Sequence, residues 1–286
     1  MFGFRSDGKK LKNVDPILRF TSYVMKKRYD SQVEMVKDIR CEEIDRFIKE
    51  RLAQGIKYTY MHIFIAGIVR MYALRPKLNR FVMNGRIYRR EKIYISFAIK
   101  RHLSDEGEET TLKIGFTGKE TLLEIKDMID SEIAKNSVAN VENKTDKFAR
   151  RFLKMPHFIL NPAFGMVKLM DKWGMLPKSV IELSPFHTSC FVTNMKSIGA
   201  GYVYHHLYDL GTTGLFVAIG KERFEPCIDL FGNVEVGKVI KLGLVVDERI
   251  CDGLYYSKSI RVGSKYISNP SLLEEPLEEL PVDPEA

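Results

Sequence analysis

The sequence has few cysteines, and those it has are far apart. They are Cys41, Cys190, Cys227 and Cys251, and no two form a C-x-x-C pair. Structural zinc sites and disulfide frameworks need closely spaced or paired cysteines. The pattern therefore predicts neither a metal site nor a disulfide framework, and it indicates a reducing compartment, the cytoplasm.

Long apolar runs are missing as well. A helix that spans a bilayer needs about 20 consecutive apolar residues. The richest stretch, residues 58–74, is interrupted by His62 and Arg70, which is typical of a buried amphipathic helix. The first dozen residues contain three lysines, and no apolar segment follows them. No secretory signal is therefore predicted.

No nucleic-acid-binding motif is present, although the net charge is +8. Residues 270–286 carry six acidic side chains and no basic one, so the rest of the chain carries +14. A basic body favours anionic ligands in general, including the phosphates of coenzyme A, acidic lipid and nucleic acid. Without a motif that selects it, nucleic acid is not expected as a partner.

The hydrophobic pattern divides the chain into three parts. Residues 1–18 are predicted to be a flexible lead-in, and residues 19–268 to form one domain. Residues 269–286 form an acidic tail with too little apolar surface to fold, so this tail is predicted to be disordered. Helical and strand patterns alternate irregularly within the domain. This order predicts an α/β fold, an α+β two-layer sandwich in which helices cover a mixed sheet.

Residues 144–178 stand out within this domain as a basic helical insert. Basic side chains outnumber acidic ones eight to two, and bulky apolar residues are dense. Pro156, Pro162 and Pro177 are predicted to divide the insert into short helices. Two interpretations stay open: a helical subdomain that packs on the core, or a surface that contacts a partner subunit or an anionic membrane.

The most informative stretch lies near the end of the domain. The apolar run 242–246 predicts a buried strand, and residues 254–262 predict a helix. Between them lies Asp-Glu-Arg-Ile-Cys-Asp-Gly, residues 247–253. This pattern places several charged groups at the edge of a sheet, where a strand passes into a helix.

This motif resembles the signature D-H-R-x-x-D-G of the dihydrolipoyl acyltransferases of 2-oxo acid dehydrogenase complexes, relatives of chloramphenicol acetyltransferase. Three further stretches are similar to that family in order and spacing: residues 75–79, residues 94–99, and residues 191–195 followed by 215–220. The resemblance covers about residues 20 to 265. It implies a chloramphenicol acetyltransferase-like fold.

The resemblance also implies a reaction, in which an acyl group passes between a thioester and a thiol, and coenzyme A or acyl-CoA is a substrate. The position of the family's catalytic histidine is Glu248. Thr193 matches the hydroxyl that stabilises the oxyanion, and Asp252 matches an acid that pairs with an arginine, here Arg19 or Arg28. No metal is implied. Family members are trimers with active sites between subunits, so a homotrimer is expected.

The chain lacks the lipoyl domain and the Asp-Lys-Ala lipoylation site of the full-length family members. A stand-alone catalytic core of this kind has no swinging acyl arm of its own. If it is active, the acyl group comes from free acyl-CoA or from a lipoyl or carrier arm of another protein.

Glu248 leaves two hypotheses open. A carboxylate with an ordinary pKa near 4.3 is a poor base toward a thiol with a pKa near 8.5. Moving the proton from the thiol to the carboxylate costs about 6 kcal/mol. Burial can raise a carboxyl pKa to about 7 or above. The chain is therefore either an acyltransferase with an altered catalytic base or a non-catalytic binding or scaffold relative.

His205 and His206 are the alternative bases. Adjacent side chains of an extended segment point to opposite faces, so the two are not expected to bind one metal. A structural or surface role is predicted for both, and replacement of the missing histidine by one of them stays a possibility.

Overall fold

One mixed sheet runs through the middle of the molecule. The computed structural model describes residues 5–100, 109–137, 144–228 and 231–285. In spatial order the strands are β2 (Gln32–Arg40), β10 (Val234–Asp247), β8 (Leu215–Ile219), β7 (Cys190–Asn194), β5 (Ile93–Lys100) and β6 (Glu109–Phe116). A further strand, β9 (Arg223–Ile228), forms a hairpin with the first part of β10. The neighbours β5, β7 and β8 are parallel, and the other pairs are antiparallel, which confirms the predicted mixed sheet.

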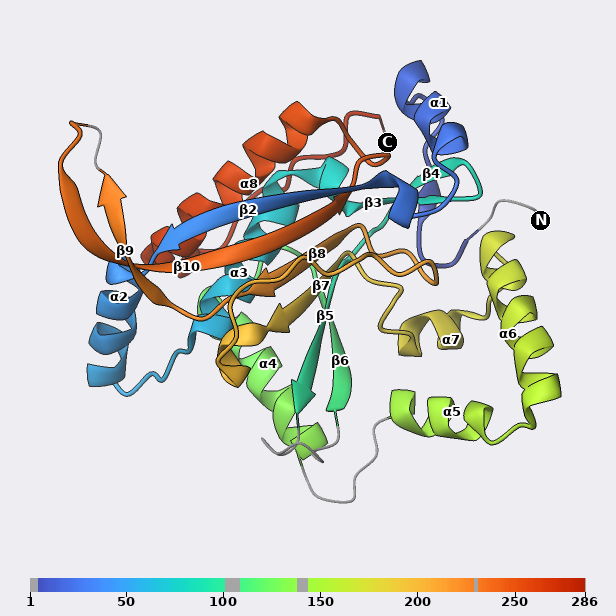
Figure 1. Cartoon of the computed structure of the whole chain (residues 1–286), viewed down its shortest axis with the longest axis horizontal. Helices are drawn as coiled ribbons and strands as arrows, with labels where there is room; N and C mark the ends of the chain where they lie inside the picture. The colour runs from blue at the N-terminus through green and yellow to red at the C-terminus, as the bar shows by residue number, and fades with distance from the viewer. Residues whose placement is uncertain (1–4, 101–108, 138–143, 229–230, 286) are drawn as a thin grey trace.

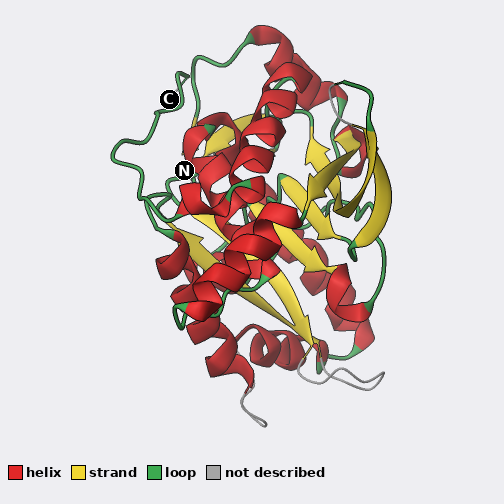
Figure 2. Cartoon of the chain, turned by 90° about the vertical axis from the view of Figure 1, so that its left-hand side faces the viewer, coloured by secondary structure: helices red, strands yellow, loops and turns green. Residues whose placement is uncertain are grey.

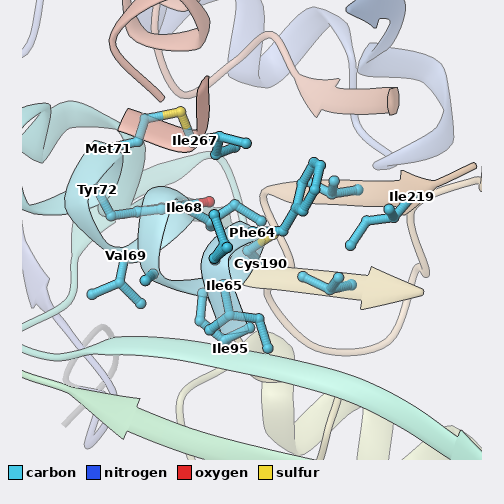
Figure 3. Packing of buried hydrophobic residues seen from close by; sticks show 14 of the residues in the cluster. Phe64, Ile65, Ile68, Val69, Met71, Tyr72, Ile95, Cys190, Ile219 and Ile267 are labelled. Atoms are coloured by element: carbon cyan, nitrogen blue, oxygen red, sulfur yellow. The ribbon is translucent and has the colours of Figure 1, made fainter. Parts of the chain in front are cut away.

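Helices cover one face of this sheet (Figures 1 and 2). They are α2 (Glu42–Ala53), α3 (Tyr60–Leu74), α4 (Leu122–Ser137) and α8 (Gly253–Ser268). Alternate strand residues share one core with them, because side chains on a strand point to opposite faces. In α3, apolar side chains such as Phe64, Ile65 and Ile68 are buried against Cys190 and Ile219 (Figure 3). The predicted α/β fold class is confirmed.

A loop covers part of the other sheet face. Phe191, Phe216 and Val245 point to this side and pack with Leu207 from the loop. The loop lies so close to β10 that a Cβ at Gly243 would lie 2.1 Å from the carbonyl oxygen of Val203. Glycine at this position is therefore what lets the loop cross the sheet.

A small second sheet contains β1 (Lys9–Lys10), β4 (Arg86–Arg89) and β3 (Arg80–Met83), in that order. The turn between β3 and β4 has φ of 52° at Asn84 and 68° at Gly85. Positive φ at both positions is what a two-residue hairpin with an Asn-Gly turn requires. The short helices η1 (Tyr29–Ser31), η2 (Pro76–Asn79) and η3 (Met195–Ile198) connect the larger elements.

The lead-in is more ordered than predicted over the residues that the structure describes. Leu11 and Val14 are buried against the small sheet, and Asp15 caps α1 (Pro16–Val24) by accepting two backbone hydrogen bonds. Arg5 pairs with Asp171 of the insert at 2.8 Å. In place of the predicted flexible segment, scattered apolar residues and one ion pair connect residues 5–18 with distant parts of the chain.

The acidic tail also differs from the prediction. It begins with η4 (Pro270–Leu273), where Leu273 is buried in the main core. Asp283 pairs with the buried Arg80, and Glu274 pairs with Arg51 at 2.6 Å. The sequence predicts a disordered tail for lack of apolar surface, and the structure places its carboxylates against arginines of the basic body.

The insert forms α5 (Lys144–Leu153), α6 (His157–Lys172) and α7 (Lys178–Leu183) at one edge of the molecule (Figure 1). Pro162 lies inside α6, so it does not divide the segment as predicted. A proline in a helix removes one backbone hydrogen bond, and here that loss does not end the helix. Within the described residues, no helix has the length and apolar character needed to cross a membrane.

Candidate functional site

The turn after β10 is held together by a buried ion pair. The guanidinium of Arg249 donates to both carboxylate oxygens of Asp247, with Nε–Oδ1 at 2.8 Å and Nη2–Oδ2 at 2.7 Å. Ser31 Oγ donates to Asp247 Oδ1 at 3.0 Å, and Arg28 Nε lies 3.8 Å from Asp247 Oδ2. Bidentate arginine pairs of this kind fix geometry as well as adding energy. The sequence therefore builds a rigid support directly beneath position 248.

Glu248 lies between two buried neighbours but is itself exposed. Its backbone N–H donates to the carbonyl oxygen of Ser31 at 2.9 Å. Its side chain borders a hollow of about 530 Å³, which we call the Glu248 hollow. Lys77, Cys251 and Glu285 line this hollow, together with residues of α1. The carboxylate is thus held at the mouth of an accessible space.

Asp252 has a different place from the one the resemblance implies. Its side chain is exposed and caps α8 by accepting the backbone N–H of Tyr255 at 2.8 Å. In the described part of the chain it pairs with neither Arg19 nor Arg28. Arg28 is fully surrounded by protein and lies beside Asp247 instead. The expected Asp252–arginine pair is therefore replaced by one at the start of the motif, where the buried arginine finds the buried carboxylate.

Cys251 also borders the Glu248 hollow but is not a ready nucleophile. Burial raises the pKa of its thiol to about 12, and the thiolate is the reactive form of cysteine. Its neighbour Tyr256 is buried, and its hydroxyl donates to the carbonyl oxygen of Asp247 at 2.7 Å. Both residues are buried and stabilise the turn, so neither is placed to react with a molecule in the hollow.

Thr193 lies far from Glu248 within one chain. Thr193 is opposite Ala218 of β8, which is opposite Gly243 of β10. Glu248 follows Gly243 by five residues, roughly 16 Å along the strand at about 3.3 Å per residue. Two strand spacings add roughly 10 Å across the sheet, so the two side chains are on the order of 20 Å apart. A single chain does not bring these two predicted site residues together.

The half-buried Thr193 hydroxyl lies 3.9 Å from Met195 Sδ, a weak contact. The two histidines differ in their surroundings. The ring of His205 stacks on Phe216, with centroids 4.4 Å apart, and His206 is exposed. Within the described residues no group of three or more potential ligands is placed to hold a metal ion.

Sequence reasoning missed the residues that reach this site from far along the chain. Lys77 Nζ pairs with Glu285 at 2.6 Å on one side of the Glu248 hollow, and Ser31 supports Asp247 from below. Arg28 was a predicted partner for this motif, but it supports Asp247 rather than Asp252. The only signal for the first pair was the contrast between the acidic tail and the +14 body. No local pattern pointed to Ser31.

Comparisons with known proteins identify the fold. No family model and no curated protein match the sequence. A probable dihydrolipoamide acetyltransferase from Listeria monocytogenes 4b F2365 has a similar structure, with a TM-score of 0.56, 14% identity, and 91% of this chain and 94% of that chain covered. Dihydrolipoamide acetyltransferase (E2p) from Azotobacter vinelandii has a TM-score of 0.56 and 11% identity, with 90% of this chain and 88% of that chain covered. A chloramphenicol acetyltransferase has a TM-score of 0.53 and 10% identity, with 92% of this chain and 98% of that chain covered. The chain has the chloramphenicol acetyltransferase-like fold, as the resemblance implied.

Proposed function

We propose that this protein is a CoA-dependent acyltransferase that moves an acyl group between a thioester and a thiol, with Glu248 in place of the histidine base. The observation that carries the proposal is the placement of Glu248 at the mouth of the Glu248 hollow, on a turn made rigid by Asp247 and Arg249. The fold supports it, because solved acyltransferases have the same fold.

The spacing of the motif gives further support. The Azotobacter vinelandii structure concerns the role of a serine, a histidine and an asparagine in that protein's catalytic mechanism, and its histidine and asparagine are four positions apart. Glu248 and Asp252 have the same separation. In this proposal Thr193 donates a hydrogen bond to the tetrahedral oxyanion, as hydroxyl donors do in acyl transfer. Asp252 begins α8 and so fixes how the chain leaves the site.

We also propose that the active assembly is a homotrimer in which the site forms between copies. The separation of Thr193 and Glu248 within one chain supports this arrangement. The β9–β10 hairpin supports it as well, because a two-stranded ribbon is marginally stable alone and this one exposes large apolar side chains. These side chains are Phe224, Ile228, Val234 and Val236.

The substrates in this proposal are acyl-CoA, or an acyl group on a lipoyl or carrier arm of another protein, together with a thiol acceptor. The basic body suits the phosphates of coenzyme A. The four cysteines, which are free, agree with a location in the reducing cytoplasm.

A non-catalytic binding or scaffold role is the second candidate. The observation that favours it is the exposure of Glu248. A carboxylate becomes a stronger base only when burial or a nearby like charge disfavours its ionised form. One chain supplies no such burial at Glu248, so a neighbouring copy or the bound substrate has to supply it for the enzyme proposal to hold.

Thioester turnover separates the two candidates. Acyl-CoA and a dithiol acceptor are incubated with the wild type, Glu248→Ala and Thr193→Ala, and with Glu43→Ala as a control for loss of an exposed carboxylate. The enzyme proposal expects losses of about 10² to 10⁴-fold for Glu248→Ala and about 10² to 10³-fold for Thr193→Ala. Equal rates in all four proteins would refute both roles. Tight acyl-CoA binding without turnover by the wild type would establish the scaffold role instead.

A further inference from the structure

Helix α6 of the insert carries an apolar stripe that faces away from the protein. Its members recur every three or four residues, which places them on one side of a helix. They are Phe158, Pro162, Met166, Leu169 and Trp173. Phe158 is 78% exposed, Met166 57% and Leu169 50%. The stripe runs the length of α6, roughly 24 Å at about 1.5 Å per residue.

The opposite side of α6 is fixed to the body, so the outward direction of the stripe is set by the fold. Asp171 is buried and pairs with Arg5 at 2.8 Å, and the ring of His187 lies 3.2 Å from it. Just beyond α6, Leu176 is buried, as is Ile181 in α7. These contacts tie down the inner side of the helix, and among the described residues Phe158, Met166 and Leu169 of the stripe stay at least half exposed.

Lysines border the stripe on one side. Lys168 and Lys172 are one turn apart, and each directly precedes a stripe residue, so they lie about 100° around the helix from it. With Lys26 and Lys27 from the segment after α1, they line a hollow of about 510 Å³, which we call the lysine hollow. The hollow also holds two carboxylates. Asp171 is engaged by Arg5, and the Asp209 carboxylate accepts the backbone N–H of Arg28 at 3.3 Å.

We propose that α6 docks the protein onto an anionic lipid bilayer, with its apolar stripe at the boundary between headgroups and acyl chains and its lysines on lipid phosphates. A helix with one apolar face, a basic border and an aromatic residue lies in the plane of a membrane interface. The charge of the border selects anionic lipid, since each lysine near such a surface adds about fivefold to the affinity. The position of α6 at the edge of the molecule leaves it accessible to an extended surface (Figure 1).

Trp173 reports on this docking directly, because it is the only tryptophan in the chain. Its emission is recorded while the intact protein is mixed with phosphatidylcholine vesicles, with or without about 30% phosphatidylglycerol, and sedimentation with the vesicles is measured in parallel. Docking predicts a blue shift and co-sedimentation with the anionic vesicles, both reduced at about 1 M salt, where charges are screened within about 3 Å. Absence of both with anionic vesicles, or equal binding to neutral ones, would overturn the proposal.

Two double variants assign the binding to α6 while keeping the tryptophan. Phe158→Ser with Leu169→Ser removes part of the stripe, and Lys168→Glu with Lys172→Glu reverses the basic border. We expect each to weaken vesicle binding by at least about tenfold. The matched controls, Leu52→Ser with Leu123→Ser and Lys49→Glu with Lys258→Glu, change exposed residues on α2, α4 and α8 and should bind as the wild type does.

Light scattering on the same proteins distinguishes a membrane from a protein neighbour. The proposal expects the stripe variant to keep the oligomeric mass and the circular dichroism of the wild type. A smaller mass would show that α6 contacts another copy of the chain and would overturn the membrane assignment, as would undiminished vesicle binding by the stripe variant. Thioester turnover does not enter this test, so its outcome is independent of the proposed enzyme function.

Discussion

At the scale of single residues, the position of residue 248 is set by its buried neighbours and does not depend on its own side chain. Asp247 and Arg249 are buried and paired, while the residue between them faces solvent. Such a pair is costly to desolvate, and keeping it at one turn fixes the direction of the exposed side chain. The identity of residue 248 can therefore change without disturbing its position.

Glu248→His follows from this arrangement as a gain-of-function prediction. An imidazole has an ordinary pKa near 6.5 and is a better base toward a thiol than an exposed carboxylate. For the non-catalytic candidate, in which Glu248 contributes no base catalysis, we expect thioester-to-dithiol transfer to rise by about 10² to 10⁴-fold, the usual contribution of a positioned general base. The rate is measured with acyl-CoA, and Thr193→Ala in the same background should cancel most of the gain. A Glu248→His protein that folds and binds acyl-CoA but turns over no faster would contradict this prediction.

Asp171 predicts how stability changes in acid. Burial alone would raise the pKa of this carboxyl, but hydrogen bonding and charge from His187 and Arg5 hold the pKa at about 2. An aspartate in an unfolded chain titrates near 3.9. Its stabilising contribution is therefore complete above about pH 4 and is lost as the pH falls toward 2. At about 1.4 kcal/mol per pKa unit, the contribution is about 3 kcal/mol.

Urea unfolding of the wild type and Asp171→Asn between pH 2 and 6 checks this. The free energy difference between the two proteins should be largest above pH 4 and shrink below it. Comparing the two removes the contribution of the other carboxylates. A difference that stays constant over this range would show that Asp171 is not the titrating group.

At the scale of elements, most of the fold could be predicted because periodicity is a local property. The apolar run at residues 242–246 and the helical pattern at residues 254–262 each describe one element by itself, and the structure has a strand and a helix there. The tight turn at Asn84 and Gly85 is local in the same way. The parts that could not be predicted join distant segments: Arg80 with Asp283 and Lys77 with Glu285. No spacing in the sequence encodes such pairs.

The candidate site shows the same limit. The motif at residues 247–253 predicted that charged groups lie where a strand meets a helix, and the structure has them there. The arginine partner was assigned to Asp252, whereas Arg28 lies beside Asp247. Which carboxylate a remote arginine meets depends on burial, and burial is decided by the packing of the whole chain.

The acidic tail gives a test of one such long-range contact. Arg80 is fully buried, and Nε of its guanidinium donates to Asp283 Oδ2 at 2.5 Å. Asp283→Asn removes the charge and leaves a buried guanidinium without its main counter-ion. We expect a loss of about 3 kcal/mol in the free energy of unfolding, the usual result of breaking a buried pair. Urea denaturation measures it, with Glu279→Gln as the control for an exposed carboxylate of the same tail. Equal midpoints for the two variants would contradict the contact.

At the scale of the whole molecule, a single chain holds two incomplete halves of the proposed site. Glu248 and its support lie at the end of β10, and Thr193 lies at the other end of the sheet, roughly 20 Å away. Cyclic assembly places different parts of identical subunits against each other. In the proposed trimer, Thr193 of one copy therefore meets Glu248 of the next.

Subunit mixing tests this arrangement. Thr193→Ala and Glu248→Ala are each expected to be inactive as pure trimers, but a co-refolded one-to-one mixture contains interfaces that join an intact Thr193 to an intact Glu248. Random assembly produces this combination at about a quarter of all interfaces, so we expect recovery of about a quarter of wild-type thioester turnover. Mixing the trimers without refolding is the control and should recover none. If the refolded mixture stays inactive while light scattering shows mixed trimers, the two residues do not share a site, and the geometry of one chain then leaves Thr193 outside the chemistry.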